Sequence, residues 1–292
     1  MITVKLIGGL GNQMFQYACG RALAERMQTQ LCFDLSAFKH YRPHSYGLGN
    51  FNGQVVNAPK YLNMGTPFWA VARRLGLNTS HYLSALGIRW VHEAGELGYQ
   101  PQRLVFQGDA YLDGYWQCAR YFDDFTLHIR EDFCLSPFLL DTFLERRKQL
   151  GIGSGVTVSV HIRRGDYVTD QSANKTHGVL CKKYYQGALE HLMVQLGGDI
   201  RLIVFSDDTA WARENFRAHA VITHVDANLQ FPQVDMHLMA ACDHHVIANS
   251  SFSWWGAWLN PSPSKIVIAP AKWFMNTALN ADDICPTEWV RL

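Results

Sequence analysis

The stretch that most constrains the fold is the run 156–167, where an apolar, β-branched segment stops at two arginines, a glycine and an aspartate. Residues 156–162 predict a buried strand, because valine, isoleucine and threonine favour extended backbone. Arg163 and Arg164 follow at its carboxyl end, where guanidinium groups could bind a diphosphate bidentately without losing their charge. Alternatively, Asp166 pairs with an arginine and fixes the loop. This segment alone is consistent with both interpretations.

An apolar strand followed by a polar turn recurs through the C-terminal half of the chain. The predicted strands, each given with the residues that follow it, are 201–205 with Ser206, Asp207 and Asp208, 244–248 with Asn249, Ser250 and Ser251, and 266–269 with Pro270. Segments with apolar residues at helical spacing lie between them. Strands that alternate with helices predict an α/β fold with a doubly wound parallel sheet. Ligands of such sheets bind beyond the carboxyl ends of the strands.

The beginning of the chain carries a second distinctive turn. Residues 3–7 predict a strand, Gly8, Gly9 and Gly11 form a glycine-rich turn, and 14–27 predict a helix with one apolar face. Glycines let backbone N–H groups approach an anion or a sugar closely at a helix N-terminus. A dinucleotide-binding turn looks similar, and Asp34 lies at a suitable distance downstream. The third glycine of that fingerprint is absent, however, because its position is occupied by methionine.

Four motifs in order carry a resemblance to a known family. They are GGLGNQMFQYA at 8–18, DGYWQCARYF at 113–122, HIRRGDY at 161–167 and NSSFSWWGAW at 249–258. Together they resemble the α-1,2-fucosyltransferases of the inverting, GDP-fucose-dependent glycosyltransferase family 11, over residues 2 to about 275. Residues 53–104 match none of these motifs, so we expect them to influence the choice of substrate.

The resemblance implies a fold and a domain organisation. It predicts a GT-B-like α/β protein, with two facing Rossmann-like domains and a cleft between them. Residues 1–150 would form an acceptor-side domain, and residues 151–292 would bind GDP-fucose. The glycine-rich stretch 151–155 supports a boundary near Gly151, because it interrupts a predicted helix before the next strand begins.

The implied reaction is inverting transfer of L-fucose from GDP-β-L-fucose to O2 of a terminal β-galactoside, which forms an α-1,2 linkage. The diphosphate leaving group must be stabilised as its charge develops. The resemblance implies that Arg163 contacts the β-phosphate and that no metal or other cofactor is required. Asp207 and Asp208 could be mistaken for metal ligands, but we expect at least one of them to cap a helix or to lie in a solvated turn.

Further donor contacts are implied by the resemblance. The expected residues are Gly9, Gly11, Asn12, His161, Arg163, Asp207, Asp235, Asn249, Ser250, Ser251 and Phe252. The serines would complete a phosphate cradle with the helix that follows them, and their alternative role is simple N-capping. Asp235 would bind guanine, or would instead be an acidic residue at a helix N-terminus. His161 could equally be a hydrogen-bonded core histidine.

On the acceptor side, the expected residues are Gln13, Tyr115, Trp116 and Asp166. Asp166, or Asp170 four residues later, could accept the proton from galactose O2, although Asp166 could instead orient an arginine. The tryptophan-rich segment offers sugar platforms. For Trp254, Trp255 and Trp258 we expect at least two to be core residues, and a core role is equally expected for Tyr115 and Trp116.

Composition narrows the function classes. A net charge of +1 over 292 residues argues against a nucleic-acid partner. Seven cysteines without a C-x-x-C pair favour reduced thiols, hence a cytoplasmic protein. No apolar run reaches the roughly 20 residues that cross a bilayer, and no signal peptide precedes the first strand. We therefore expect no stable membrane insertion, although peripheral contact with the inner membrane would suit membrane-borne glycan acceptors.

Three rival functions make different demands. A lectin would use the tryptophans without needing the arginines or the glycine turn. An adhesion ligand would expose the tripeptide 164–166, which spells an integrin-binding sequence, on a secreted chain. A nicotinamide dehydrogenase would need the missing glycine. Thermal shifts with GDP, UDP, CMP and NAD distinguish these alternatives, because a ligand stabilises the folded state that binds it.

Overall fold

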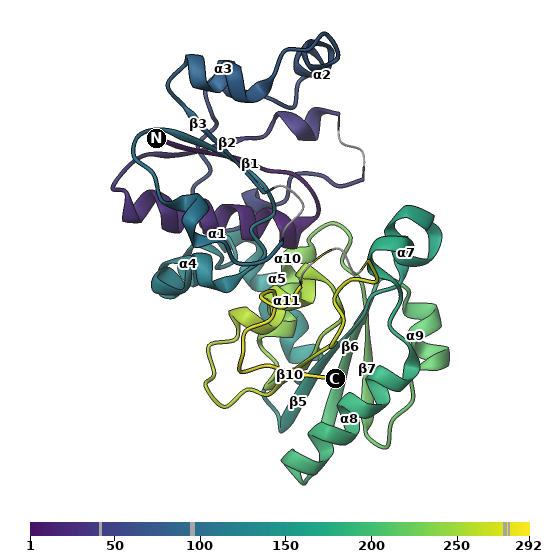
Figure 1. The fold of residues 1–292 in the computed structure, drawn as a ribbon. Coiled ribbons are helices and arrows are strands. Elements are labelled where there is room, and N and C mark those ends of the chain that lie inside the picture. Colours follow the sequence, from purple (N-terminus) through teal and green to yellow (C-terminus); the bar gives the residue numbers. More distant parts are fainter. Residues whose placement is uncertain (41–42, 94–96, 277–278, 280) are drawn as a thin grey trace. The chain divides into compact units, whose positions relative to one another are not determined.

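The computed structural model describes residues 1–40, 43–93, 97–276, 279 and 281–292. The chain divides into two compact units (Figure 1). Unit 1 comprises residues 1–134 and 282–284, and unit 2 comprises residues 135–281 and 285–292. A short C-terminal piece therefore returns to unit 1: Asp283 pairs with Arg120, and its carboxylate accepts a hydrogen bond from the backbone N–H of Tyr99.

Unit 1 is built on a parallel sheet with the strand order β2-β1-β4-β3. Its strands are β1 (Ile2–Lys5), β2 (Leu31–Asp34), β3 (Arg89–His92) and β4 (Ala110–Asp113). Its α-helices are α1 (Leu10–Arg26), α2 (Pro67–Arg74), α3 (Thr79–Ala85) and α4 (Thr126–Asp132). Short 3-10 helices are η1 (Ser36–Lys39), η2 (Leu48–Asn50), η3 (Lys60–Leu62), η4 (Pro101–Leu104), η5 (Ala119–Tyr121) and η6 (Asp123–Phe125).

The two faces of this sheet are covered by different helices. On one face, Tyr17 of α1 stacks on Phe33 of β2 at a centroid distance of 5.2 Å. On the other face, Cys32 and Tyr111 belong to the core that α2 and α3 cover. This alternation is the period of two that a strand imposes on its side chains.

Unit 2 contains a parallel sheet with the strand order β10-β9-β8-β5-β6-β7. Its strands are β5 (Val156–Ile162), β6 (Ile200–Ser206), β7 (Val221–Asp226), β8 (His244–Val246), β9 (Val267–Ala269) and β10 (Val290–Arg291). Its helices are α5 (Pro137–Gln149), α6 (Gly165–Thr169), α7 (Gln171–His177), α8 (Lys182–Leu196), α9 (Thr209–Asn215), α10 (Pro232–Ala240) and α11 (Ser251–Leu259). The doubly wound parallel sheet predicted from the sequence is therefore confirmed.

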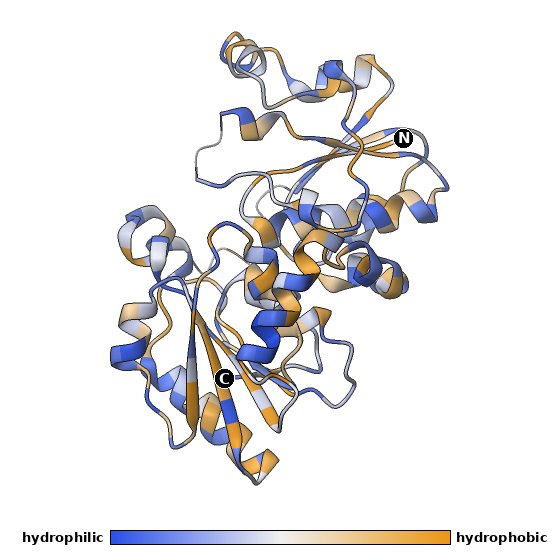
Figure 2. Cartoon of the chain, turned by 180° about the vertical axis from the view of Figure 1, so that it is seen from behind, coloured by the Kyte–Doolittle hydropathy of each residue, from blue (hydrophilic) through white to orange (hydrophobic). Residues whose placement is uncertain are grey.

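The core of unit 2 explains why its strands are continuous apolar runs. Val158, Val160 and Leu202 pack with Leu189 and Leu192 of α8 on one face of the sheet. Helices α10 and α11 lie on the other face, and both faces are buried, as is usual for a parallel sheet. Figure 2 shows the hydrophobic colour along these strands and the hydrophilic colour on the outer helices.

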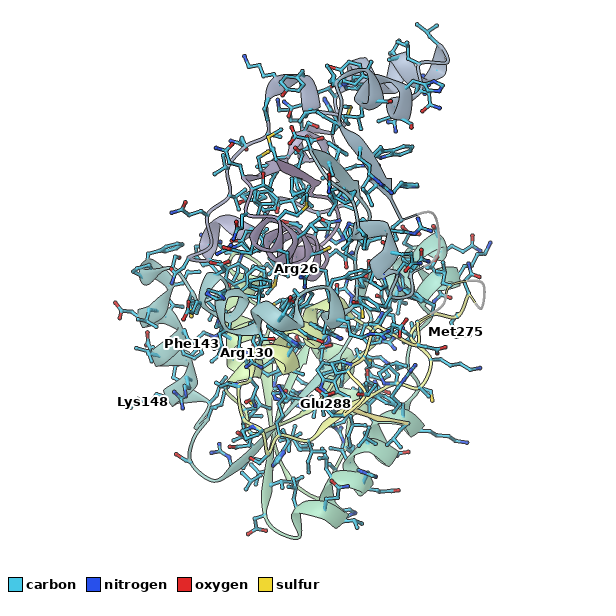
Figure 3. All side chains as sticks on the ribbon, turned by 60° about the vertical axis from the view of Figure 1, so that its left-hand side comes forward. Arg26, Arg130, Phe143, Lys148, Met275 and Glu288 are labelled. Carbon is cyan, nitrogen blue, oxygen red and sulfur yellow. The ribbon has the colours of Figure 1, made fainter. Side chains whose placement is uncertain are left out.

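The expected domain boundary at 150/151 is wrong, because α5 belongs to unit 2. Helix α5 packs on α10: the Phe143 ring lies 6.2 Å from the His237 ring, and Arg146 pairs with Asp235. Figure 3 shows Phe143 and Lys148 on this helix. The glycines 151–155 mark the turn from α5 into β5 within one unit, and composition alone could not distinguish such a turn from a linker.

The tryptophan-rich helix α11 is a core element. Trp254, Trp255 and Trp258 are all buried, and their rings contact one another at centroid distances of 5.0 to 6.1 Å. Trp289 joins them from the C-terminal segment. The expectation that at least two of the three are core residues is confirmed, so they are not sugar platforms. Among the described residues, no helix is both long and apolar enough to cross a bilayer.

Candidate active site

The order of strands in unit 2 places a binding position at the end of β5. The chain runs from β5 outward to β6 and β7, then returns to the other side of β5 to form β8 and β9. At such a switch point the connections leave in opposite directions, and the carboxyl ends of the two central strands border a crevice. Arg163 follows β5 at this point, and residues 249–251 follow β8.

Arg163 lies between two carboxylates. Its Nη2 is 2.6 Å from Oδ1 of Asp166, and its Nη1 is 2.8 Å from Oδ2 of Asp207. The side chain is one-quarter exposed, and its guanidinium lies 5.3 Å from the Tyr167 ring. The interpretation in which Asp166 holds an arginine therefore describes this structure. It does not exclude phosphate binding, because a guanidinium carries five N–H donors.

Arg164 makes a different set of contacts from those of Arg163. Its Nε is 3.1 Å from Oδ2 of Asp208, and its guanidinium stacks over Trp211 at 3.9 Å. Asp208 also caps α9 by accepting the N–H of Trp211 at 3.1 Å. The expectation that Asp207 or Asp208 caps a helix is thus confirmed for Asp208. Asp207 instead accepts the N–H of Arg164 at 2.8 Å.

The loop after β5 is linked to the turn after β8. The hydroxyl of Tyr167 donates to the carbonyl of Asn249 at 3.2 Å, and the Tyr167 ring stacks on His177 at 4.7 Å. The Asn249 amide donates to the carbonyl oxygens of His177 and Trp273. Ser250 then caps α11 by accepting the N–H of Phe252 at 3.3 Å. The capping role is confirmed for Ser250, while a phosphate contact by Ser250, Ser251 or Phe252 stays a prediction.

Nδ1 of His161 and Oδ1 of Asn249 are among the buried polar atoms near this switch point that have no hydrogen-bond partner among the described residues. An unsatisfied buried polar group costs about 1–3 kcal/mol of stability, so we expect each of these two atoms to form a hydrogen bond with a ligand or a water. His161 is not the fully hydrogen-bonded core histidine of the alternative interpretation. Its ring lies 5.8 Å from that of Phe252, at the beginning of α11.

Burial keeps two histidines of unit 2 neutral. It lowers the pKa of His161 to about 3, with a further contribution from Arg163, and lowers the pKa of His245 to about 3, with help from Lys265. His245 is a packing residue, because its ring is buried and forms hydrogen bonds with Ser159 and Asn260.

These histidines predict the pH dependence of stability. Between pH 6.5 and 3 the unfolded chain binds more protons than the folded one, so stability falls as pH falls. We expect the free energy of unfolding to drop by about 2 kcal/mol per histidine from pH 7 to 5. Urea unfolding monitored by tryptophan fluorescence measures this. His161→Gln should reduce this slope, and the exposed His219→Gln should leave it unchanged. Equal slopes in all three proteins would contradict the assignment.

Two expected site residues have local roles in the structure. Asp170 caps α7: its Oδ1 accepts the N–H groups of Ser172 and Ala173 at 2.7 and 3.2 Å. Asp235 lies in the first turn of α10, where its two oxygens accept hydrogen bonds from Arg146 and from the N–H of Asn228, both at 2.7 Å. Burial raises the pKa of Asp235, against the effect of these two partners. Guanine binding by Asp235 stays a prediction.

In unit 1 the glycine turn is shorter than the sequence indicates. Helix α1 begins at Leu10 rather than at residue 14, with Gly9 as its extended N-cap residue, and Gly8 has φ +89°. The N–H groups of Asn12 and Gln13 already bind the carbonyl of Gly9, at 3.0 and 3.1 Å. Only the first residues of the turn are therefore placed to offer backbone donors to a ligand.

The polar side chains of α1 hold the surrounding loops. Gln13 is fully buried and donates to the carbonyl oxygens of Gly8 and Ser45, while its own oxygen accepts the N–H of Gly47. Asn12 accepts a hydrogen bond from the Gln117 amide at 2.7 Å. Gln13 therefore has a structural role, and acceptor binding by this buried side chain is not supported by its contacts.

Of the expected aromatic pair, only Tyr115 faces solvent. Trp116 is fully buried, as the core interpretation predicted, and it adopts the left-handed backbone with φ +55°. A non-glycine residue in this region costs of order 1–3 kcal/mol and is typical of functional turns. Tyr115 remains 38% exposed, beside the glycine turn: a Cβ on Gly8 would lie 3.4 Å from its ring.

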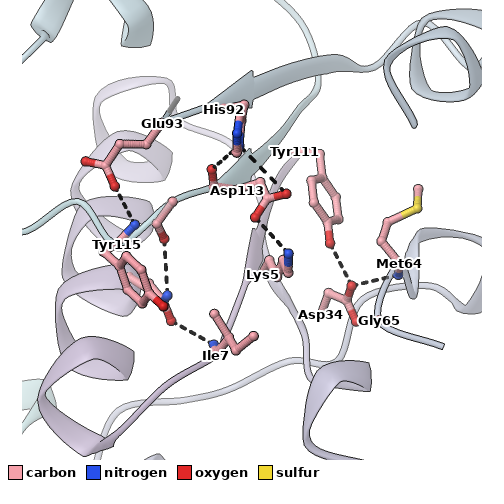
Figure 4. A network of polar contacts seen from close by, with 12 residues as sticks. Lys5, Ile7, Asp34, Met64, Gly65, His92, Glu93, Tyr111, Asp113 and Tyr115 are labelled. Carbon is pink, nitrogen blue, oxygen red and sulfur yellow. Dashed lines mark hydrogen bonds and ion pairs between the residues drawn. The ribbon is translucent and has the colours of Figure 1, made fainter. Parts of the chain in front are cut away.

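Glu93, which the sequence alone did not indicate, fixes this turn. One carboxylate oxygen accepts the N–H groups of Tyr115 and Trp116 at 2.6 and 3.2 Å, and the other is buried without a hydrogen bond to any described residue (Figure 4). Burial raises the pKa of this carboxyl, against the effect of these two N–H groups. The sequence feature that could have indicated Glu93 is its position directly after the strand 89–92. Arg163 and Arg164 were noticed because they follow the strand 156–162 in the same way.

Figure 4 also shows why a dinucleotide site does not fit unit 1. Asp34, the acid that such a site would use, is fully buried and accepts hydrogen bonds from the Tyr111 hydroxyl and the N–H groups of Met64 and Ser36. Both carboxylate oxygens therefore take part in hydrogen bonds within unit 1. No cluster of three or more metal-ligating side chains occurs among the residues that the structure describes.

Comparisons with known proteins identify the family of this chain. The family model described as glycosyl transferase family 11 matches residues 102–292. The chain is 34% identical to an α-1,2-colitosyltransferase of Escherichia coli, covering 100% of this chain and 99% of the relative. It is 32% identical to the O-antigen biosynthesis glycosyltransferase WbnK of Escherichia coli, over 98% and 99% of the two chains. It is 26% identical to bovine galactoside α-(1,2)-fucosyltransferase 2, over 89% and 69%.

Solved structures share the fold. A FUT1 variant from Arabidopsis thaliana in complex with GDP superposes with a TM-score of 0.58 at 12% identity, covering 99% of this chain and 75% of that one. The fucosyltransferase NodZ from Bradyrhizobium gives a TM-score of 0.53 at 12% identity, over 89% and 93%. The GT-B-like α/β fold expected from the sequence is confirmed.

Proposed function

The chain belongs to glycosyl transferase family 11 and is a glycosyltransferase, and from that premise we propose that it transfers L-fucose from GDP-β-L-fucose to O2 of a terminal β-galactoside. The observation that carries this proposal is that Arg163 follows β5 and the N-terminal turn of α11 follows β8, the two adjacent strands at the switch point of unit 2. A fixed cation and a helix N-terminus both favour a diphosphate. The two unsatisfied atoms of His161 and Asn249 mark the same position.

The α-1,2 linkage is supported by the relatives, whose names include both α-1,2-colitosyl and α-(1,2)-fucosyl transfer. Their donor sugars differ, so colitose transfer is the second candidate. It is favoured by the higher identity over the whole chain, 34% against 26%. Turnover of GDP-fucose and GDP-colitose at equal concentration decides between them. We expect GDP-fucose to give the higher kcat/KM, and the reverse would assign the protein to colitose transfer.

Metal independence is part of the proposal. The adjacent carboxylates Asp207 and Asp208 form ion pairs with Arg163 and Arg164, respectively, instead of facing each other as metal ligands. Arg163 carries five N–H donors, so it can also stabilise the leaving diphosphate. We expect GDP to raise the melting temperature more than UDP, CMP or NAD, both with and without EDTA. Activity that disappears in EDTA and returns with Mn²⁺ would overturn this part of the proposal.

The acceptor is expected to be recognised through its galactose hydroxyls. A 2-deoxygalactose acceptor should be inert because it lacks the nucleophile, and glucose-terminated or α-linked acceptors should be poor. Lactose, lacto-N-biose, N-acetyllactosamine and Galβ1-3GalNAc test the linkage preference, and NMR of the product locates the new bond. Fucose on O3, on O6 or on an inner N-acetylglucosamine would reject the proposed regiochemistry.

The contacts of Asp166 and Asp170 predict different mutant behaviour. Asp166→Asn should lower kcat about a hundredfold if Asp166 accepts the acceptor proton. The affinity for GDP should stay nearly unchanged, because Asp207 still holds Arg163. Asp170→Asn is the matched control, since asparagine caps a helix as well as aspartate and kcat should be close to normal. Equal losses of kcat and GDP affinity in Asp166→Asn would reject the base assignment.

A further inference from the structure

Charge is distributed unevenly along this chain. Residues 35–92 contain no aspartate or glutamate, although they contain Lys39, Arg42, Lys60, Arg73, Arg74 and Arg89. The rest of the chain therefore carries 20 lysines and arginines against 25 acidic residues. The overall charge of +1 conceals a cationic segment in unit 1 and an excess of acid elsewhere.

This cationic segment includes a protruding apolar turn. We call residues 71–78, which comprise the last turn of α2 and its connection to α3, the hairpin tip. Val71, Leu75 and Leu77 are 53%, 79% and 57% exposed, and Arg73 and Arg74 lie among them with exposed side chains. Isolated exposed apolar residues are ordinary, but three in eight consecutive residues that also carry two cations form an amphipathic patch.

The leucines of the hairpin tip are not required to hold it in place. Trp69, Ala72 and Leu83 are buried beneath α2 and α3, and Trp69 packs edge-on against Tyr82 at 4.6 Å. Leu77 lines a cavity of about 720 Å³ together with Trp69 and Tyr82, so it is not packed into the core. The hairpin covers the face of the sheet opposite α1 (Figures 1 and 2).

The cations of the hairpin tip, together with its leucines, favour one kind of binding partner. A second copy of the chain would bring like charges together at the same surface, which opposes pairing. A polyanion such as nucleic acid would contact the arginines but would leave the leucines in water. An anionic bilayer satisfies both groups, because leucine side chains enter the acyl boundary while arginines reach the headgroup phosphates.

We propose that the hairpin tip docks this protein on the surface of anionic lipid bilayers, with Leu75 and Leu77 inserted and Arg73 and Arg74 at the headgroups. The inference is independent of the proposed reaction, because it rests on a surface of unit 1 and its test does not use activity.

Sedimentation with vesicles tests the role of the two arginines. The full chain should bind vesicles of phosphatidylcholine with 30% phosphatidylglycerol, and not pure phosphatidylcholine, in low salt. Each cation near such a surface contributes about fivefold to binding, so replacing Arg73 and Arg74 with glutamate should weaken binding about thirtyfold or more. The matched control is Lys148→Glu with Lys183→Glu, two exposed lysines of unit 2, which should bind like the wild type.

A second pair of variants tests insertion. Leu75→Ser with Leu77→Ser should weaken binding at least tenfold, because both side chains lose apolar burial. Leu75→Phe with Leu77→Phe should retain it. Leu144→Ser with Val194→Ser, at exposed positions of unit 2, is the matched control. All variants should keep the wild-type melting temperature and its shift by GDP, which shows that the fold and the nucleotide site are intact.

Three results would overturn the proposal. The first is equal binding to the neutral and the anionic vesicles. The second is wild-type binding by the serine pair, which would show that the leucines do not insert. The third is binding of heparin or DNA by the arginines with no binding of vesicles.

Discussion

Replacing Arg163 with lysine should lower kcat about a hundredfold or more. Lysine keeps the charge but loses the planar fork that can face two carboxylates and a phosphate at once. Loss of one group that stabilises developing charge typically costs 10²–10³ in kcat. Steady-state kinetics with GDP-fucose, together with the affinity for GDP from calorimetry, measure the effect. The KM for the acceptor should change little.

Two companion variants locate the effect. Arg164→Lys should be milder, because Arg164 is engaged with Asp208 and Trp211. Gly165→Ala leaves the arginine intact but places a Cβ 2.5 Å from Oδ2 of Asp207, so it should displace that carboxylate and lower kcat as well. A near-normal kcat in Arg163→Lys would transfer the role to Arg164 or to Lys175, a cation in the last turn of α7.

Breaking the Arg146–Asp235 pair should produce the largest loss of stability. The Arg146 side chain is 23% exposed and that of Asp235 is 8% exposed. Arg146→Met leaves a buried carboxylate without its cation, which typically costs about 3 kcal/mol or more. The folded-state pKa of Asp235, already raised by burial, should then rise further. At pH values between the unfolded-state pKa and the raised folded-state pKa of Asp235, the unfolded state binds fewer protons than the folded state. The variant should therefore lose more stability at pH 8 than at pH 5.

The same pair separates a structural from a nucleotide-binding role for Asp235. Urea unfolding at both pH values gives the stability, and calorimetry gives the affinity for GDP. Asp235→Asn in the Arg146→Met background should recover part of the lost stability, because it removes the unpaired charge. If Asp235 binds guanine, Asp235→Asn alone should weaken GDP and Arg146→Met should not. Unchanged GDP affinity in Asp235→Asn would leave the residue only its structural role.

The sequence predicted the elements of unit 2 well, because its strands are buried on both faces. Long β-branched runs such as 156–162 leave few alternatives, and the turns that follow them contain the charged residues. Contacts between distant residues could not be read in this way. Nothing near Asp235 in sequence indicates that Arg146 would reach it from α5, and nothing near Asp207 indicates its contact with Arg163.

Predictions for unit 1 were weaker for a related reason. Gln13 and Trp116 belong to the motifs at 8–18 and 113–122, and motif membership suggested contact with a substrate. The structure shows both as buried parts of the turns that they stabilise. A polar residue on a helix face that is otherwise apolar indicates an internal hydrogen bond as readily as a ligand. Glu93 was overlooked because its partners are backbone N–H groups, which leave no trace in the sequence.

The return of residues 282–284 to unit 1 has a consequence for synthesis on the ribosome. The N-terminal part of a chain emerges first and ordinarily folds first, at about 5–20 residues per second of translation. Here Asp283 provides the partner of Arg120 and of the Tyr99 N–H only after residues 135–281 have been made. At that rate the delay is on the order of 10 seconds. The first unit to emerge is therefore completed only when nearly the whole chain has been made, and Arg120 lacks its partner Asp283 during that interval.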